Sequence, residues 1–162
     1  IHNDWRFDNV ILDPQQPTQV IGVLDWEMAT LGDPLMDLGS ALAYWIQEDD
    51  DALMKSSRRQ PTHLKGMLTR QQVVDYYLDK TGLQPENWAF YEVFGLFRLA
   101  VIAQQIYYRY YHQQTDNPAF KDFWIMIHAL HIRALKLIAQ NNAEAQQLIP
   151  EYGAKLQDIL KR

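Results

Sequence analysis

The first 37 residues alternate short apolar runs with polar segments, and this pattern predicts a β-hairpin. The apolar runs are Val10–Leu12 and Val20–Leu24, and the Asp13–Thr18 segment between them contains two prolines, which cannot continue a strand. Two such runs joined by a turn pair as antiparallel strands, so that the start of the first faces the end of the second. Asn9 and Asp25 are therefore expected to lie side by side.

Beyond the hairpin, apolar residues recur every three or four positions, which predicts helices. Asp33 and Pro34 are typical of a helix start, as N-cap and first helical residue. A capping box at Thr69–Gln72 and a glycine stop at Gly82 bound another helix. The helices expected from these signals span approximately residues 34–47, 69–82, 88–113, 119–141 and 150–160.

The segment from Glu48 to Leu68 lacks this periodicity and is expected to be a long connection. An acidic run, Glu48–Asp51, precedes a basic stretch that contains Lys55, Arg58 and Arg59. Two interpretations stay open: a solvated loop, or a segment that gates the substrate, because long loops inside compact domains often serve function. In the second interpretation, Lys55, Arg58 and Arg59 would contact an anionic substrate.

Composition limits the class of protein. The 162 residues are expected to form a single α+β domain over residues 1–162, mostly α. A net charge of −5 gives no electrostatic reason to expect nucleic acid or an anionic membrane as a partner. The absence of cysteine excludes disulfides and thiolate metal sites and fits a reducing compartment, so a cytoplasmic location is expected. Arg98 interrupts the most apolar stretch, so no run is expected to reach transmembrane length.

Polar residues around the predicted hairpin suit phosphoryl transfer. The amide oxygen of Asn9 and the carboxylate of Asp25 would contribute to a site for Mg²⁺, which takes few protein ligands when nucleotide phosphates and water supply the rest. Asp4, a short loop upstream, would then orient or deprotonate an attacking hydroxyl group.

Several motifs together resemble the C-terminal lobe of the aminoglycoside phosphotransferase family, which has a protein-kinase-like fold. They are the segments His2–Asn9, Leu24–Glu27 and Leu31–Leu38, with the hairpin between the first two. The first segment is most similar to the kinase-like domains fused or adjacent to acyl-CoA dehydrogenases, and Tyr91–Ala100 is also similar to that group. The resemblance implies a kinase-like C-lobe in which a small hairpin carries the site.

The resemblance also implies a role for each matching residue. Asp4 would be the catalytic base, and Asn9 and Asp25 would be the Mg²⁺ ligands. Arg6 lies two residues after Asp4, where protein kinases often carry a lysine, and would contact the phosphate or the substrate. One residue departs from the pattern, because Asn3 occupies the usual glycine position. Asparagine is among the more tolerant substitutes in a left-handed conformation, so either the loop geometry survives or activity is reduced.

Two interpretations stay open for each of three further residues. Asp37 would brace the catalytic loop around His2, or would only interact with a helix dipole. Glu27 would assist a second metal ion or would cap a turn. Arg98, set among apolar residues, would pair with Glu92 or Asp37, or would bind an anion in the acceptor cleft.

The chain begins inside its own catalytic motif, so it is expected to be the C-terminal part of a longer protein. In the family, an N-terminal lobe supplies a glycine-containing nucleotide loop and a phosphate-pairing lysine, and no glycine-rich phosphate-binding motif occurs here. This chain alone is therefore not expected to catalyse turnover.

These observations favour an ATP- and Mg²⁺-dependent phosphotransferase that acts on the hydroxyl group of a small molecule. The resemblance suggests a hydroxyacyl-CoA or a related acid as acceptor, while the acidic run Glu48–Asp51 keeps a cationic aminoglycoside open. One alternative, motivated by Asn3 and the missing N-terminal lobe, is a pseudokinase-like module that binds nucleotide or ligand without turnover. A purely structural helical domain is the other.

Overall fold

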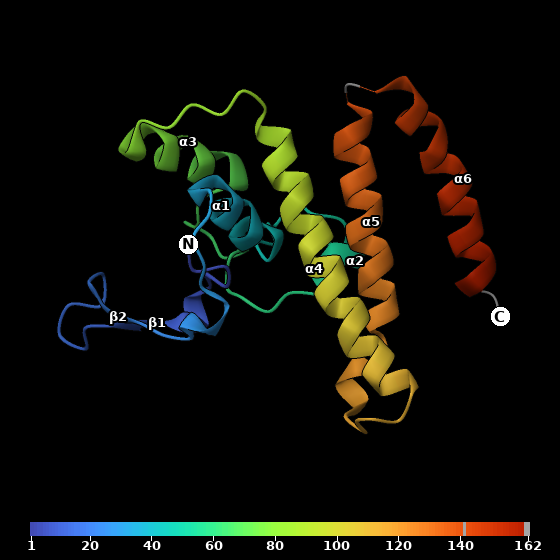
Figure 1. Cartoon of the computed structure of the whole chain (residues 1–162), viewed down its shortest axis with the longest axis horizontal. Helices are drawn as coiled ribbons and strands as arrows, with labels where there is room; N and C mark the ends of the chain where they lie inside the picture. The colour runs from blue at the N-terminus through green and yellow to red at the C-terminus, as the bar shows by residue number, and fades with distance from the viewer. Residues whose placement is uncertain (141, 161–162) are drawn as a thin grey trace.

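The computed structural model describes residues 1–140 and 142–160 and shows a small hairpin beside a helical body (Figure 1). The strands are β1 (Val10–Leu12) and β2 (Val20–Val23), and short 3₁₀ helices are η1 (Phe7–Asn9), η2 (Trp26–Met28) and η3 (Pro118–Phe120). The α-helices are α1 (Pro34–Ala43), α2 (Ala52–Ser56), α3 (Arg70–Thr81), α4 (Trp88–Tyr111), α5 (Phe123–Ala139) and α6 (Ala143–Leu160). This confirms the predicted α+β class, mostly α.

The two strands pair antiparallel, as predicted, with Val10 opposite Val23. The N–H of Leu24 donates to the carbonyl oxygen of Asn9 at 2.8 Å, so Leu24 is the direct neighbour of Asn9 and Asp25 lies one residue further on. The second strand ends earlier than predicted because the backbone of Asp25 is left-handed, with φ of 65°, and leads into η2. The hairpin therefore brings Asn9 and Asp25 to the same end without pairing them directly.

Helix α4 is the centre of the helical body. Helices α1 and α5 pack against α4, and α6 packs against α5 on the outside (Figure 1). Where α1 crosses α4, a Cβ atom on Gly95 would overlap the carbonyl oxygen of Gly39, and one on Gly39 would overlap that of Tyr91. The two helices therefore touch backbone to backbone. The main core cluster consists of Ala43, Ile46, Met54, Leu96, Leu99, Ala129 and Leu130.

Helix α4 is more apolar than the sequence analysis expected. By length and composition alone it would be able to cross a membrane, although Arg98 lies within it. In this structure it carries the buried residues Leu96 and Leu99 and packs against α1 and α5. These contacts are those of a central helix in a helical body.

Three helix boundaries differ from the prediction. Helix α1 ends at Ala43 rather than near residue 47, because the Thr62 hydroxyl accepts from the N–H of Ile46 at 3.1 Å and donates to its carbonyl at 2.8 Å. The helix expected over residues 119–141 is divided into η3 and α5, and its expected end at residue 141 lies outside the described residues. Helix α6 begins at Ala143, because the side chain of Asn142 accepts a hydrogen bond from the N–H of Ala145 at 3.1 Å.

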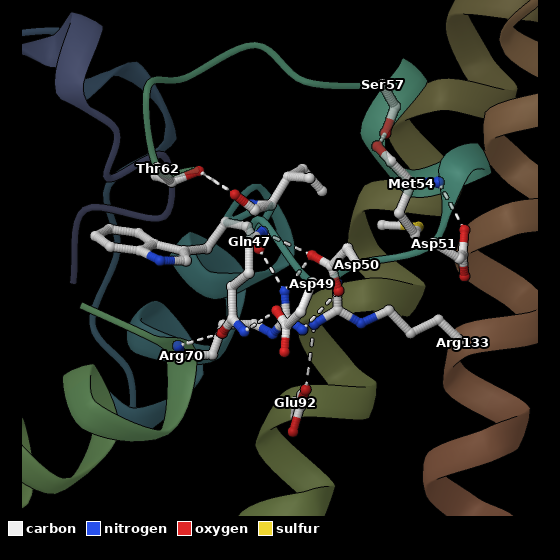
Figure 2. A network of polar contacts seen from close by, with 12 residues as sticks. Gln47, Asp49, Asp50, Asp51, Met54, Ser57, Thr62, Arg70, Glu92 and Arg133 are labelled. Carbon is white, nitrogen blue, oxygen red and sulfur yellow. Dashed lines mark hydrogen bonds and ion pairs between the residues drawn. The ribbon is translucent and has the colours of Figure 1, made fainter. Parts of the chain in front are cut away.

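The segment expected to be one long connection, residues 48–68, contains α2 and is fixed by polar contacts (Figure 2). Asp51 caps α2 by accepting from the N–H of Met54 at 2.9 Å. Arg70 donates to both carboxylate oxygens of Asp50, at 2.6 and 2.8 Å, and Asp49 accepts from the side chain of Gln47 at 2.9 Å. Three of the four residues in the acidic run thus make internal contacts, which weakens the case for an acidic, aminoglycoside-binding rim.

Candidate active site

One carboxylate fixes the backbone at the start of the loop His2–Asn9, the expected catalytic loop. The oxygens of Asp37, in the first turn of α1, accept hydrogen bonds from the N–H groups of His2 at 2.6 Å and Asn3 at 2.8 Å. Hydrogen bonds to an ionised carboxylate are stronger than those between neutral groups, so this contact holds both residues in one conformation. The geometry matches the bracing role expected for Asp37.

The ring of His2 joins the loop to the hairpin. Its Nδ1 atom receives the N–H of Asp4 at 3.2 Å, and its Nε2 atom lies 2.7 Å from the carbonyl oxygen of Leu24. Because a backbone N–H can only donate and a carbonyl can only accept, these two contacts fit the tautomer that carries its proton on Nε2. The buried ring also packs between Trp5 and Trp26, with centroid distances of 5.7 and 4.8 Å.

Asn3 takes the left-handed conformation that the usual glycine would adopt. Its φ angle is 66°, and its side-chain amide donates to the carbonyl oxygen of Met28 at 3.0 Å. Asparagine tolerates this region better than most residues, and here a hydrogen bond offsets part of the remaining cost. The loop geometry therefore survives the replacement of glycine.

The two carboxylate oxygens of Asp4, the expected catalytic base, differ in their contacts: one accepts a hydrogen bond and the other forms only a long ion pair. The side-chain nitrogen of Asn9 donates to Oδ2 of Asp4 at 3.1 Å and to its backbone oxygen at 2.8 Å. The other oxygen, Oδ1, faces Nε of Arg6 at 3.5 Å, which is an ion-pair distance but a long one for a hydrogen bond. Oδ1 is therefore the atom best placed to receive a proton.

Asn9 and Asp25 have the chemistry expected for a hard divalent cation. Because the nitrogen of Asn9 is used on Asp4, its amide oxygen remains for a ligand. Asp25 is exposed, and its carboxylate makes no capping hydrogen bond to η2. The described residues contain no cluster of three or more His, Asp or Glu side chains that could hold a metal, so a cation here would depend on phosphates and water for its other ligands.

A cleft of about 830 Å³ opens beside Asp4. Arg6, Asp8, Glu27 and Tyr44 share its lining with Asp4. The lining also includes an apolar set from α4, η3 and α5, formed by Leu99, Ile102, Ile106, Phe120, Phe123 and Met126. The cleft is therefore amphipathic, with the expected catalytic carboxylate in its polar part. Glu27 lies in this cleft, whereas Asn9 and Asp25 are not part of its lining.

Three arginines that line the cleft form no ion pair within the described residues: Arg59, Arg98 and Arg109. The salt bridge considered for Arg98 is wrong, because Glu92 pairs with Arg133 at 3.4 Å and Asp37 accepts from the loop backbone. Arg109 was not anticipated from sequence, since it lies among tyrosines at the end of α4 and belongs to no recognised motif.

The two neighbouring arginines of the basic stretch differ in position. Both are exposed, but only Arg59 lines the cleft. Arg58 is not part of that lining and donates from Nε to the carbonyl oxygen of Lys55 at 3.1 Å. Of the two, only Arg59 is therefore placed to contact a molecule bound beside Asp4.

Sequence reasoning also missed two residues that support the loop. The buried side chain of Gln60 accepts from the N–H of Phe7 at 2.9 Å, across more than fifty positions of sequence. Tyr44, directly after α1, places its ring 5.3 Å from the guanidinium carbon of Arg6. Burial raises the pKa of Tyr44, and the nearby charge of Asp4 adds to the rise. No local motif identifies either residue, because each acts through a contact distant in sequence.

Comparison with known proteins gives concordant results. Residues 1–68 match the phosphotransferase enzyme family. Acyl-CoA dehydrogenase family member 10 of Mus musculus is 38% identical over 67% of this chain and 10% of its own length. A probable acyl-CoA dehydrogenase of Arabidopsis thaliana is 30% identical over 97% of this chain and 19% of its own. The chain thus spans less than a fifth of these relatives.

A solved structure extends the likeness to the fold. A proposed aminoglycoside phosphotransferase of Ralstonia eutropha superposes with a TM-score of 0.65 and 28% identity, over 80% of this chain and 39% of that protein. The resemblance inferred from the sequence motifs is therefore confirmed: residues 1–68 carry the sequence pattern of the phosphotransferase enzyme family, and the chain has the kinase-like fold of an aminoglycoside phosphotransferase.

Proposed function

We propose that the protein containing this chain transfers the γ-phosphoryl group of ATP to a hydroxyl group of a small anionic molecule. The match of residues 1–68 to the phosphotransferase enzyme family supports transfer in general. The observation that carries the more specific proposal is the cleft in which Asp4 lies with three arginines, Arg59, Arg98 and Arg109, that have no carboxylate partner in the described residues.

In this proposal Asp4 orients the acceptor hydroxyl and takes its proton on Oδ1 as the new phosphate ester bond forms and ADP leaves. Asn9 holds the other carboxylate oxygen, so Asp4 needs no reorientation during the reaction. Asp37 and Gln60 fix the backbone on either side. Such preorganisation lowers the activation barrier because the loop is ordered before the substrate binds.

The cation and nucleotide are parts of the proposal. The amide oxygen of Asn9 and the carboxylate of Asp25 would hold Mg²⁺, and the carboxylate of Glu27 would assist a second ion. When bound, Mg²⁺ neutralises charge on the phosphates. The nucleotide would be held largely by an N-terminal lobe, outside this chain.

The acceptor that best fits the cleft is a hydroxyacyl-CoA or a related hydroxy acid. Arg59 and Arg98 suit carboxylate or phosphate groups, because guanidinium binds both through paired N–H donors. The apolar part of the lining suits an aliphatic body. A polycationic aminoglycoside would meet three arginines here, and most of the acidic run that would have attracted it is engaged in internal contacts.

The alternative of a pseudokinase-like module loses part of its support. Its main motivation within this chain was Asn3 in place of glycine, and Asn3 adopts the left-handed conformation with its side chain hydrogen-bonded. Asp4, Asn9 and Asp25 are also all retained. A protein that only binds its ligand has no need of the three together.

The test is Mg²⁺-dependent ADP release by the full-length protein with hydroxyacyl-CoA thioesters, free hydroxy acids and aminoglycosides as acceptors. We expect release with the anionic acceptors and a loss of about 100-fold or more in Asp4→Asn, as for removal of a general base. Arg59→Met should raise KM for these acceptors without changing KM for ATP.

Arg58→Met is the matched control, because it removes the neighbouring arginine outside the cleft. Faster release with aminoglycosides, or equal effects of the two arginine variants, would contradict the assigned acceptor class. No release above Asp4→Asn with any acceptor, while nucleotide still binds, would favour the pseudokinase-like module.

A further inference from the structure

The side chain of Arg6 is held by three groups at once. Its Nε atom lies 3.5 Å from Oδ1 of Asp4, and one of its terminal nitrogens lies 3.2 Å from Oδ2 of Asp8. The ring of Tyr44 lies against the guanidinium, 5.3 Å from its central carbon. All four side chains line the cleft. Nε of Arg6 is buried and makes no hydrogen bond in the described part of the chain.

This arrangement is unusual for an arginine beside a carboxylate. A guanidinium free to move would donate two parallel hydrogen bonds to the carboxylate at less than about 3 Å. Here the terminal nitrogen is directed to Asp8 instead, and the ion pair with Asp4 is long. Some contact other than Asp4 must therefore hold the guanidinium, and the ring of Tyr44 is in place to do so through a cation–π interaction.

We propose that Tyr44 and Asp8 are positioning residues, which hold Arg6 beside Asp4 but prevent it from forming a forked ion pair with the catalytic carboxylate. The inference rests on the proposed function, in which Oδ1 of Asp4 must be open to the acceptor hydroxyl. It gives Arg6 a fixed place beside Asp4 at the edge of the cleft. Neither Tyr44 nor Asp8 touches the reacting atoms in this account.

The environment of Tyr44 suits this role. Burial and the charge of Asp4 both raise the pKa of its hydroxyl, so the ring stays neutral across the physiological range. The charges of Arg6 and, to a smaller extent, Arg98 lower this pKa but do not reverse the rise. The π face offered to Arg6 is therefore independent of pH in that range, and the hydroxyl group is not needed for the contact.

The test is steady-state kinetics of the full-length protein with Tyr44→Phe, which keeps the ring, and Tyr44→Leu, which removes it. We expect Tyr44→Leu to lower kcat roughly three- to tenfold with KM for ATP unchanged, the size expected for one cation–π contact. Tyr44→Phe should restore most of the rate. In an Arg6→Ala background the leucine substitution should have no further effect, because a positioning residue acts only through its partner.

Tyr76→Leu is the matched control. Tyr76 on α3 makes an equivalent contact with Lys80, at 5.5 Å, and does not line the cleft, so its loss should leave kcat unchanged. Equal rates for Tyr44→Leu and Tyr44→Phe, or effects of Tyr44→Leu and Arg6→Ala that simply multiply, would overturn the inference. So would a loss of kcat in Tyr76→Leu as large as that in Tyr44→Leu.

Crystal structures of the wild type and Tyr44→Leu give a readout that does not depend on turnover. We expect Arg6 to close onto Asp4 in the variant, with two nitrogens within about 3 Å of the carboxylate. An unchanged guanidinium would overturn the inference. If the wild type shows no turnover with any acceptor, the proposed function fails, and this pair of structures still decides whether Tyr44 positions Arg6.

Discussion

The conformation of Asp4 depends on a few hydrogen bonds that converge from distant parts of the chain. Asp37 receives two backbone N–H groups of the loop, His2 receives a third, and Gln60 receives a fourth. Each donor would be left without a partner if its acceptor were removed, and a buried unpaired donor costs about 1–3 kcal/mol. The loop is therefore rigid because its backbone donors are satisfied by side chains rather than by secondary structure.

Asp37→Asn tests the brace at the level of a single atom. An amide has one acceptor oxygen where the carboxylate has two, so the N–H of either His2 or Asn3 would face an NH₂ group. We expect a loss of about 2 kcal/mol in the free energy of unfolding, measured by urea denaturation, and a lower kcat. Unchanged stability would mean that solvent can replace Asp37.

Asn3 allows a second test at this scale, because its backbone and side chain contribute separately. Alanine would keep the left-handed backbone at a cost of about 1–2 kcal/mol and would lose the hydrogen bond to Met28. Glycine would lose only that bond and would relieve the backbone. Thermal unfolding should therefore rank Asn3→Ala below both the wild type and Asn3→Gly, and the opposite order would contradict the assigned geometry.

At the scale of elements, the crossing of α1 and α4 places the catalytic loop relative to the cleft. Asp37 lies on α1 and Arg98 on α4, so the distance between these helices sets the distance between the brace and the acceptor side. The close approach requires Gly39 and Gly95, since a Cβ on either would enter backbone atoms of the other helix. A helix–helix contact thus determines the shape of the site.

Gly95→Ala should destabilise the protein by about 3 kcal/mol or more, because the backbone of α1 cannot move aside as a flexible side chain would. Gly153→Ala on α6 is the matched control. No atom lies within 4 Å of its Cβ position, so there alanine should stabilise the helix by about 0.5–1 kcal/mol. Denaturant unfolding of both variants checks the pair, and equal effects would contradict the backbone contact.

The contact between Asp50 and Arg70 anchors the chain between α1 and α3 and has a defined pH dependence. Burial alone would raise the pKa of Asp50, but the hydrogen bonds from Arg70 and from the N–H of Gln47 outweigh it and hold the pKa below its usual 3.8. The pair therefore contributes stability above the unfolded pKa, which is lost as the pH falls through the lower pKa of the folded state.

The lowered pKa of Asp50 predicts how the stability of an Asp50→Asn variant depends on pH. Asp50→Asn should have a lower Tm than the wild type at neutral pH, and the difference should shrink as the pH falls below about 4, where the wild-type carboxylate becomes protonated. Thermal unfolding between pH 3 and 7 measures it. A difference that stays constant over this range would show that the charge of Asp50 contributes nothing.

At the scale of the whole molecule, the sequence predicted what depends on local pattern. The hairpin, the capping box at Thr69 and the glycine stop at Gly82 follow from residues close in sequence, and the structure confirms all three. The motif around Asp4 identified the family for the same reason. The early end of α1 was not predictable, because Thr62, sixteen residues away, replaces the helical hydrogen bonds of Ile46.

The residues of the candidate site also divide into those that the local sequence predicts and those that only the tertiary fold brings together. Asp4 and Asn9 lie in one short stretch, and the predicted hairpin brings Asp25 to the same end as Asn9, so this part of the arrangement was readable from the sequence. Tyr44, Gln60 and Arg109 act through contacts that only the tertiary fold creates, and no periodicity or motif marks them. The ion pair considered as one of two interpretations for Arg98 does not form, since both candidate partners have other neighbours in space.

In the proposed function, Asp4 acts as the base in transfer to a hydroxyl group. The most direct measurement is ³¹P NMR of the full-length protein with Mg-ATP and a hydroxyacyl-CoA, comparing the wild type with Asp4→Asn at equal nucleotide saturation. We expect a new phosphate monoester resonance that grows with ADP in the wild type, and a rate at least about 100-fold lower in the variant. Ester formation at the same rate in both proteins would contradict this role of Asp4.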